Sequence, residues 1–348
     1  MNLTQRALAE KVGLSYPTVN RALNGLPGMS EETRRRVLET AKRLGYRKNA
    51  VARSLVLQRT NSIGLVISNN PHSFWASVVE GIESRARKQG YHVILCHSEP
   101  GGTQERENEA ISFLVDRQIE GLILAPGWRR KDFAIFKELE QRRLPVLLLD
   151  SRLAGVNASF AGADDVGGGR LGCRHLIGLG HRRIAFVAGP SQSATATRRL
   201  EGYRLAMKEA GLPVEPRWIL RAEGFLSEHG QQAAEAVLAI HPRPTAVFAV
   251  NDPVAFGLEH ALLRAGVRMP KDLALVGFSG MPEGELLAVP LTTVAAPMQQ
   301  MGRRAAEIVI ALASGKQAEP VFEELPCQLI VRASCGAVAG SSRGLVKK

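Results

Sequence analysis

Hydrophobic positions recur at helical spacing along the first 45 residues, between glycines and residues that can cap helices. In the stretch 5–12, Leu8 and Val12 fall on one face, which predicts a short amphipathic helix. Thr4 can cap the start of this helix, and Gly13 can end it. The chain therefore begins with a short helix that stops at a glycine turn.

Two further helices are predicted in the same way. Ser15 can cap a helix over 16–23, in which Pro17 falls in the first turn, where its missing N–H costs nothing. The inward positions of this helix are Val19, Ala22 and Leu23. Ser30 can cap a third helix, which Gly45 ends. The apolar positions of the third helix are Val37, Leu38, Ala41 and Leu44.

The outward face of the second helix is polar and patterned. Two short helices joined by a tight glycine turn, with a third to cover them, form a helix-turn-helix unit, whose second helix lies in the DNA major groove. Arg21 and Asn20 can hydrogen-bond to base edges. Tyr16 and Thr18 can reach bases or phosphates. The residues of this unit that we expect to contact double-stranded DNA are Thr4, Ser15, Tyr16, Pro17, Thr18, Asn20, Arg21 and Asn24.

Positive charge is concentrated in the same segment. Residues 1–60 hold twelve Lys and Arg against four Asp and Glu, a net charge of +8, whereas the whole chain carries +12. A polyanion or a membrane surface accounts for such a block, and a small acidic substrate does not need it. A small helical interaction module is the alternative to DNA binding, and the clustered charge favours DNA.

Length and composition narrow the class of protein further. The chain has 348 residues, which suits two or three domains. No apolar run reaches the ~18 residues of a membrane helix, and the N-terminus lacks the apolar segment of a secretory signal. The four cysteines, which show no CxxC spacing, are expected to be reduced thiols. We therefore expect a cytoplasmic protein without a membrane partner.

From residue 63 onward, short apolar runs alternate with amphipathic stretches. "IGLVIS", "HVILCH", "GLILAP" and "PVLLLD" are typical of buried parallel strands, and the pattern recurs in "RIAFVAG", "TAVFAVND" and "LALVGFSG". The predicted fold class is therefore α/β, with a three-helix headpiece followed by two doubly wound α/β subdomains.

The motifs resemble those of the lactose-repressor (LacI/GalR) family of bacterial transcription regulators, from about residue 3 to 335. "LAEKVGLSYPTVNRALNG" is similar to the family's recognition unit, and "KNAVARSL" is similar to its hinge helix, with the hinge closest to that of the purine repressor. Both the order and the spacing match. Pro17 departs from the glutamine or similar polar residue often found there, so the operator sequence cannot be transferred by analogy.

The resemblance assigns a role to the segment after the third helix. Asn49 can cap a helix over 50–56 that is too short to be stable alone, so we expect it to order only when docked. By the resemblance, Leu55 is a wedge inserted into the minor groove at the operator centre, and Arg53 lies in the same groove. Ala52 completes the hinge residues expected at the DNA.

These patterns give the following expected division of the chain. The headpiece spans 1–46, the linker and hinge helix 47–61, the core 62–335 and a flexible tail 336–348. Within the core, the N-subdomain is expected over about 62–160 and 292–320, and the C-subdomain over about 161–291 and 321–335. The resemblance implies subdomains of periplasmic-binding-protein type, a small-molecule effector between them, and a homodimer on a near-palindromic operator.

Ligands of such sheets bind outside the carboxyl ends of the strands. "TRRLEGY" resembles the family's Arg-x-x-Gly-aromatic motif, which makes Arg199 the strongest candidate for effector binding. Asp252 is either a ligand contact or the cap of the following helix. Phe74 is either packing or a ligand platform, and its position in the family favours the pocket. The expected effector contacts are Ser68, Phe74, Asp150, Thr195, Arg199, Phe225, Asn251 and Ser279.

The charge of the effector is a further hypothesis. Where family members that bind neutral sugars commonly carry an aspartate, after the "VGF" strand, this chain has Ser279. Arg199 remains, and an unpaired arginine in a closed cleft is costly unless the ligand pairs with it. We therefore expect an anionic or less hydroxylated effector, such as a sugar acid or sugar phosphate, bound bidentately by Arg199, unless Asp150 pairs with Arg199 instead.

Catalytic and metal signatures are not found. His175 and His181 lack a carboxylate or thiol at metal-ligand spacing, and no Gly-Lys-Ser/Thr or nucleophile elbow occurs. We expect no enzyme activity, no metal and no cofactor. The rival functions are a small-molecule binding protein without a regulatory role, which would have no use for residues 1–60, and an α/β enzyme, which would need a catalytic constellation.

Leu55→Ala is expected to reduce operator bending and operator affinity without unfolding the headpiece, because the wedge acts only in the complex. Gel mobility or energy transfer across a labelled operator measures the bend. An unchanged bend angle would contradict the role given to Leu55.

Overall fold

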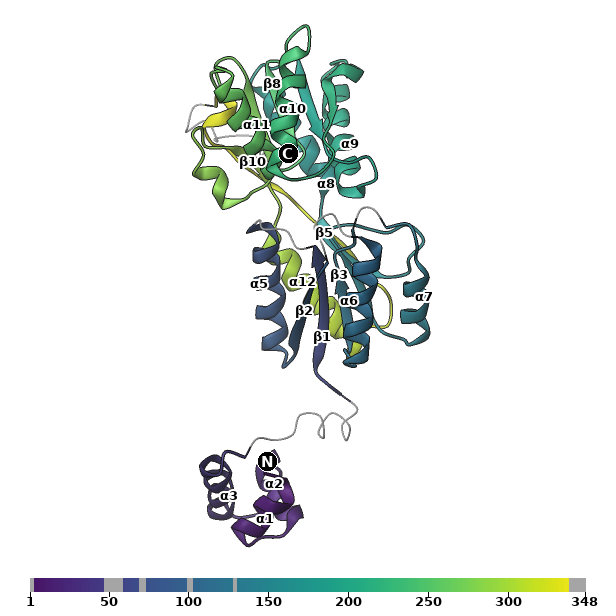
Figure 1. The fold of residues 1–348 in the computed structure, drawn as a ribbon, viewed down its shortest axis with the longest axis vertical. Coiled ribbons are helices and arrows are strands. Elements are labelled where there is room, and N and C mark those ends of the chain that lie inside the picture. The colour runs from purple at the N-terminus through teal and green to yellow at the C-terminus, as the bar shows by residue number, and fades with distance from the viewer. Residues whose placement is uncertain (1–2, 47–58, 69–72, 99–102, 128–129, 338–348) are drawn as a thin grey trace, which may run out of the picture. The chain divides into compact units, whose positions relative to one another are not determined.

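The computed structural model describes residues 3–46, 59–68, 73–98, 103–127 and 130–337. By its internal contacts the chain forms two units, 1–60 and 61–348, and each is considered by itself (Figure 1). The hinge residues Asn49, Ala52, Arg53 and Leu55 lie outside the described residues, as does most of the expected tail.

The first unit is a bundle of three short helices, as the sequence predicts. They are α1 (Gln5–Val12), α2 (Tyr16–Asn24) and α3 (Glu31–Arg43). The hydroxyl groups of Thr4, Ser15 and Ser30 each accept a backbone N–H at a helix start, which confirms the three caps. Gly13 and Gly25 end the first two helices in the left-handed conformation, which favours glycine.

The core of this unit contains one fully buried aliphatic side chain from each helix, Leu8, Val19 and Val37. Two of the apolar positions named for the third helix are not part of this core: Leu38 is 45% exposed and Leu44 is 36% exposed. Leu38 is one residue from Val37 and therefore lies about 100° around the helix, while Leu44 follows the last turn of α3.

The second unit contains two sheets of six strands. The first sheet has the order β11-β5-β4-β3-β1-β2, and all of its pairs are parallel. Its strands are β1 (Ser62–Ser68), β2 (His92–Ser98), β3 (Gly121–Leu124), β4 (Val146–Leu149), β5 (Ser159–Ala163) and β11 (Phe322–Leu325). The four apolar runs expected as parallel strands in this half are confirmed.

The second sheet has the order β12-β10-β9-β8-β6-β7 and repeats this arrangement, except that its edge strand β12 pairs antiparallel with β10. Its strands are β6 (Ile184–Ala188), β7 (Ile219–Arg221), β8 (Ala246–Ala249), β9 (Ala274–Ser279), β10 (Thr292–Ala295) and β12 (Gln328–Ile330). The expected doubly wound α/β architecture is thus present twice.

Helices cover both faces of each sheet. Those against the first sheet are α5 (Ser73–Lys88), α6 (Gln104–Asp116), α7 (Ala134–Gln141) and α12 (Met298–Ala313). Those against the second are α8 (Asp165–Gly178), α9 (Ala194–Glu209), α10 (Ser227–Ala239) and α11 (Asp252–Arg264). Short 3-10 turns occur at Pro216–Trp218, Pro282–Glu285 and Ala333–Cys335. In the part of the chain that the structure describes, no helix is long and apolar enough to cross a bilayer.

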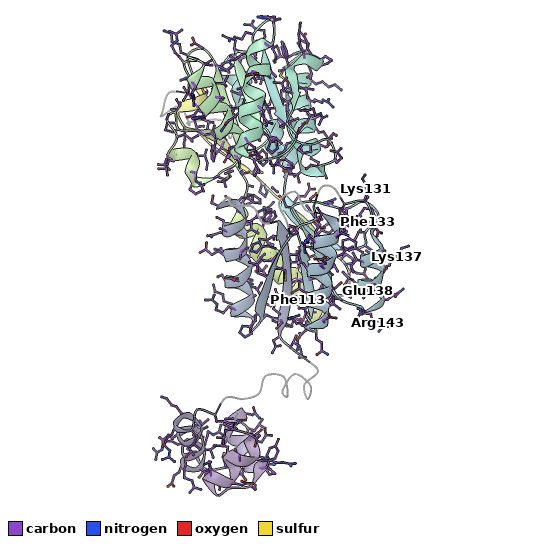
Figure 2. All side chains as sticks on the ribbon, viewed as in Figure 1. Phe113, Lys131, Phe133, Lys137, Glu138 and Arg143 are labelled. Carbon is purple, nitrogen blue, oxygen red and sulfur yellow. The ribbon has the colours of Figure 1, made fainter. Side chains whose placement is uncertain are left out.

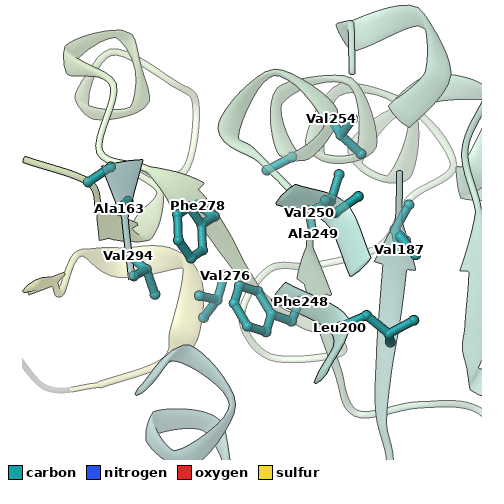
Figure 3. Packing of buried hydrophobic residues seen from close by; sticks show 14 of the residues in the cluster. Ala163, Val187, Leu200, Phe248, Ala249, Val250, Val254, Val276, Phe278 and Val294 are labelled. Atoms are coloured by element: carbon teal, nitrogen blue, oxygen red, sulfur yellow. The ribbon is translucent and has the colours of Figure 1, made fainter. Parts of the chain in front are cut away.

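Apolar side chains along β1 point alternately to the two faces of its sheet, which explains why helices cover both faces. Ile63 and Leu65 belong to the cluster under α5 and α12, while Val66 belongs to the cluster under α6 and α7. In the second sheet, Phe248 and Phe278 belong to the same apolar cluster (Figure 3). The outward side chains of α6 and α7 are exposed, among them Phe113, Lys137 and Glu138 (Figure 2).

Strand pairing corrects three expected subdomain boundaries. β5 continues in the first sheet to Ala163, beyond the expected boundary at 160. β10 pairs with β9 and so belongs to the C-subdomain, although 292 was expected to open the second part of the N-subdomain. β11 pairs with β5 in the first sheet, although 321 was assigned to the C-subdomain. An apolar run predicts a strand but does not specify its sheet, because strands adjacent in the chain need not pair.

Three helix pairs are in close contact through glycines: α5 with α12, α8 with α9, and α10 with α11. A Cβ atom at Gly302 of α12 would lie 2.1 Å from the carbonyl oxygen of Val78 on α5. One at Gly202 of α9 would lie equally close, at 2.1 Å, to the carbonyl oxygen of Val166 on α8. Backbone therefore packs directly on backbone, and only glycine fits at these crossings.

Gly302→Ala is expected to lower the free energy of unfolding by about 1–3 kcal/mol, because the added methyl group must push α12 away from α5. Gly178→Ala is the matched control, since a Cβ atom at Gly178, also in a helix, meets nothing within 4 Å. The control should leave stability unchanged or slightly raised. Urea denaturation compares the two variants, and equal stabilities would show that the crossing tolerates a side chain.

Candidate functional site

The exposed face of α2 is the candidate nucleic-acid interface. Tyr16, Pro17, Arg21 and Asn24 are exposed, while Val19 and Ala22 of the same helix are buried. This is the division of faces that the sequence predicts. A polar helix face that faces away from its own core is available to an external partner.

Five of the expected DNA contacts also take part in hydrogen bonds within the headpiece. The hydroxyl of Thr4 caps α1, and that of Ser15 caps α2 and shares a hydrogen bond of 2.8 Å with the hydroxyl of Thr18. The amide oxygen of Asn20 accepts hydrogen bonds from Gln5 at 3.1 Å and from Asn24 at 2.8 Å. Asn20 is therefore best placed to act as a donor through its amide nitrogen.

Arg21 differs from the arginines of α3. Its side chain has no hydrogen bond and no ion pair with any residue that the structure describes. Arg34 instead donates to the carbonyl of Leu26 at 2.9 Å, and Arg36 donates to that of Val12 at 3.1 Å. Part of the basic block therefore fixes turns of the headpiece, which charge counting alone does not reveal.

The expected effector contacts lie at strand ends and first helical turns, as the α/β pattern predicts. Ser68 ends β1, and its side chain lies outside the described residues. Asp150 follows β4 and Ser279 ends β9. Thr195 and Arg199 belong to the first half of α9, where both are buried.

Arg199 is paired, and the expectation that it lacks a partner is wrong. Its Nε donates to Oδ1 of Asp165 at 2.8 Å, and both side chains are at most 5% exposed. A second donor of the guanidinium reaches the carbonyl of Val250 at 2.9 Å, and its plane lies 3.9 Å from the ring centroid of Phe278. The argument for an anionic effector therefore loses its premise.

Sequence reasoning missed Asp165. Two aspartates stand together at the start of α8, and only the first, Asp164, caps the helix by accepting from the N–H of Gly167 at 2.8 Å. The second is free to meet Arg199. A doubled aspartate at a helix start is the signal that could have revealed it, because one N-terminus needs only one capping side chain.

Asp150 brings a second carboxylate to this pair from the other subdomain. Burial raises the pKa of Asp150, and the charge of Arg199 opposes that rise. The carbonyl of Asp150 accepts a weak hydrogen bond of 3.4 Å from the Thr195 hydroxyl. Asp150 and Arg199 are therefore brought together across the two subdomains, but the carboxylate that pairs with Arg199 is that of Asp165.

Asn251, rather than Asp252, caps α11. Asn251 caps α11 by accepting from the N–H of Val254 at 3.0 Å, and its amide nitrogen donates to the carbonyl of Phe225 at 2.9 Å. Asp252 does not cap the helix. Its buried carboxylate accepts from the Met281 N–H at 2.7 Å and the Thr293 hydroxyl at 2.6 Å, and burial raises its pKa to about 6.

Asn251 thus retains one N–H and one lone pair for a ligand. Asp252 serves the fold by joining α11 to the loop after β9 and to β10.

Two strand-end candidates have a strained backbone. Asp150 has φ +68° and Ser279 has φ +130°, both in the left-handed region that favours glycine. Such residues cost of order 1–3 kcal/mol and cluster at ligand sites. The strain supports a functional role for both positions.

The aromatic candidates are partly buried and pack against the core. Phe74 lies edge-to-face on Trp75, with ring centroids 5.0 Å apart, and both pack against the large apolar cluster. Phe225 is also partly buried there, and a Cβ atom at Gly189 would lie 2.6 Å from its ring. Glycine at the end of β6 therefore makes room for the Phe225 ring.

Polar bridges that the sequence did not reveal link the subdomains. The Ser73 hydroxyl at the start of α5 donates to Glu283 at 2.7 Å. Glu324 on β11 pairs with Arg198 of α9 at 2.9 Å and with Arg152, which follows β4, at 3.1 Å. The first turns of α9 and the crossover strand β11 therefore tie the two sheets together.

The two histidines considered as metal ligands have other partners. His175 lies 3.2 Å from the Cys335 sulfur, and His181 lies 3.0 Å from the Thr245 hydroxyl. Burial lowers the pKa of both imidazoles. Within the described residues, no group of three or more His, Cys, Asp or Glu could hold a metal ion.

Comparisons with known proteins agree with these features. A family model described as "Bacterial regulatory proteins, lacI family" matches residues 6–49, and one described as "Periplasmic binding protein-like domain" matches residues 173–335. The chain is 31% identical over 329 residues to the HTH-type transcriptional repressor PurR of Vibrio cholerae serotype O1 (strain M66-2), which covers 94% of this chain and 97% of that protein.

Two solved structures extend the likeness. The lac repressor dimer bound to operator and the anti-inducer ONPF has a TM-score of 0.86 and 27% identity, and the match covers 97% of this chain and 100% of that one. The complex of the transcriptional regulator CelR with cellobiose has a TM-score of 0.73 and 29% identity over 95% of this chain and 99% of that one. The chain therefore belongs to the lacI family of bacterial regulatory proteins, a non-enzymatic family of DNA-binding transcription regulators with an effector-binding core.

Proposed function

We propose that this regulator is a repressor that binds a near-palindromic operator as a homodimer, with α2 of each headpiece in the major groove. The observation that carries the proposal is the exposed face of α2, where Arg21 is without a partner among the described residues. The lac repressor structure supports it, because that protein is a dimer bound to its operator. The positive charge of residues 1–60 supplies attraction to phosphates.

The remaining DNA contacts belong to the same proposal. From the headpiece we include the other seven expected residues, and from the hinge Asn49, Ala52, Arg53 and Leu55, with Leu55 as the minor-groove wedge. An arginine at the major groove distinguishes guanine from other bases by a bidentate hydrogen bond. Arg21 would then read sequence, while the hinge would read deformability.

We further propose that a small uncharged metabolite, such as a sugar, binds between the core subdomains at Asp150, Arg199 and Ser279. The strained backbone of Asp150 and Ser279 and the fixed guanidinium of Arg199 support this. The CelR–cellobiose complex supports a sugar as the ligand class. Ser68, Phe74, Thr195, Phe225 and Asn251 complete the proposed contacts.

Arg21→Ala should weaken operator binding by about 1–3 kcal/mol and leave binding to random DNA nearly unchanged, because a base contact is lost. Arg35→Ala is the matched control: it removes the same charge from a 75% exposed side chain on α3. The control should weaken binding to both DNAs slightly and equally. Fluorescence anisotropy on the two duplexes makes the comparison.

If Arg21→Ala weakened binding to operator and random DNA equally, Arg21 would contact phosphate alone. The proposed base reading would then be wrong, although DNA binding itself would stand.

The effector site is tested by a thermal-shift screen of sugars, sugar acids and purines on the full chain. A ligand that binds only the folded state at 100 times its Kd adds about 2.7 kcal/mol of stability, which is a readily measured shift in Tm. Arg199→Gln should abolish the shift that the best ligand gives. Arg198→Gln, one residue away and bound to Glu324 at 2.9 Å, should retain it. An equal shift in Arg199→Gln would remove Arg199 from the site.

A further inference from the structure

We infer that Gln5 sets which bases Asn20 can read, by holding the Asn20 amide so that it presents only hydrogen-bond donors to DNA. Asn20 then favours guanine and disfavours cytosine at the base that it contacts. The inference rests on the proposed function, because it takes α2 to lie in the major groove. Gln5, which is not among the expected DNA contacts, is a positioning residue that acts through Asn20.

The Asn20 amide is fixed by residues of two helices. Gln5, the first residue of α1, donates from its amide nitrogen to Oδ1 of Asn20 at 3.1 Å. Asn24, one turn further along α2, donates to the same oxygen at 2.8 Å. A carbonyl oxygen accepts two hydrogen bonds, one for each lone pair. The oxygen of Asn20 is therefore fully used inside the headpiece.

The nitrogen end of the same amide is left for DNA. Among the residues that the structure describes, Nδ2 of Asn20 has no hydrogen-bond partner. The Asn20 side chain is half-buried. Turning its amide over would lose both hydrogen bonds unless the amides of Gln5 and Asn24 turned over as well, because two N–H donors cannot pair with each other. The hydrogen bond from Gln5 thus decides which end of the Asn20 amide points outward.

Donors alone distinguish the bases in the major groove. Guanine presents two acceptors there, O6 and N7, whereas cytosine presents only the N4 amino group, which is a donor. An asparagine with both ends free reads adenine instead, because its nitrogen donates to N7 while its oxygen accepts from N6. Asn20 cannot form that adenine pair, since its oxygen is already occupied by Gln5 and Asn24.

Gln5→Glu tests the inference, because a glutamate carboxylate accepts hydrogen bonds and cannot donate. Nδ2 of Asn20 must then turn toward residue 5, and its oxygen toward DNA. An oxygen that faces the groove reads the amino groups of cytosine and adenine. The variant should fold, because residue 5 is the first residue of α1 and a carboxylate there interacts favourably with the positive end of the helix.

Selection of binding sites from a pool of random duplexes, with the full chain, gives the preferred base at every position. Asn20→Ala identifies the base that Asn20 reads, as the position at which the preference is lost. There the wild-type protein should favour guanine over cytosine by about 2- to 10-fold, the contribution of one hydrogen bond. Gln5→Glu should reverse this order.

Lys11→Gln is the matched control. It lowers the net charge of α1 by one, as Gln5→Glu does, at an exposed position of the same helix. It should weaken binding to all sequences alike and keep the wild-type preference, because the charge acts on phosphates and not on base edges.

Circular dichroism shows whether each variant is folded. If Gln5→Glu does not fold, Asn20→Asp replaces it as the test: this variant can keep both inward hydrogen bonds and presents an acceptor in place of the outward donor, so it should also favour cytosine over guanine.

The inference is overturned if the wild-type protein favours a base other than guanine at this position, if Asn20→Ala alters no position, or if folded Gln5→Glu does not reverse the order. A palindromic site selected alongside such a result, with Arg21→Ala altering its own position, would show that the proposed function stands without it. A pool that yields no preferred sequence would overturn both.

Discussion

Neither sheet of the core can be completed by one continuous stretch of chain, and this constraint governs the rest of the structure. The first sheet needs β11, and its α5 face needs α12, yet both come after nearly all of the second sheet in sequence. The chain therefore passes between the sheets three times, after β5, after β10 and after β11. Because each subdomain is finished by residues from beyond the other, we expect the two to fold as a coupled pair. A change in one is transmitted through three covalent crossings as well as through contacts.

The contacts beside these crossings are polar, which suits a structure that changes between arrangements. Glu324, on the last crossing, holds one arginine from each subdomain, and these side chains are 30–45% exposed. Exposed ion pairs of this kind contribute little to stability, so they can be exchanged at small cost. The helix crossings at glycine are rigid by contrast. Backbone packs on backbone where α5 meets α12, which leaves no room for the two helices to shift against each other. Rigid helix pairs joined by exchangeable bridges are what a shift between two subdomain arrangements requires.

The sequence predicts the elements well and their partners less well. Caps at Thr4, Ser15 and Ser30 and the apolar strands follow from local pattern, because each depends on neighbours in the chain. The sheet to which β10 belongs does not follow from local pattern, since strand pairing depends on residues far apart in the chain. The candidate site shows the same difference between what local sequence predicts and what depends on distant partners. Arg199 was found from its motif, but its partner Asp165 was not, because two adjacent aspartates look alike until the helix start selects one as its cap.

Arginine has opposite tasks in the two units, and burial decides which. Arg21 is exposed and without a partner among the described residues, so water solvates its charge in the free protein. Its donors are therefore available to a base edge. Arg199 is 4% exposed and is neutralised within the protein by Asp165, so in the proposed site it would orient a ligand while contributing little net charge. Two thirds of the net charge lies in residues 1–60, which we propose bind the polyanion, whereas the charge of Arg199 in the proposed effector site is paired with Asp165. The uncharged effector that we propose would not act on DNA by charge. Under the proposed function, its influence on DNA binding would come from the arrangement of the two core subdomains.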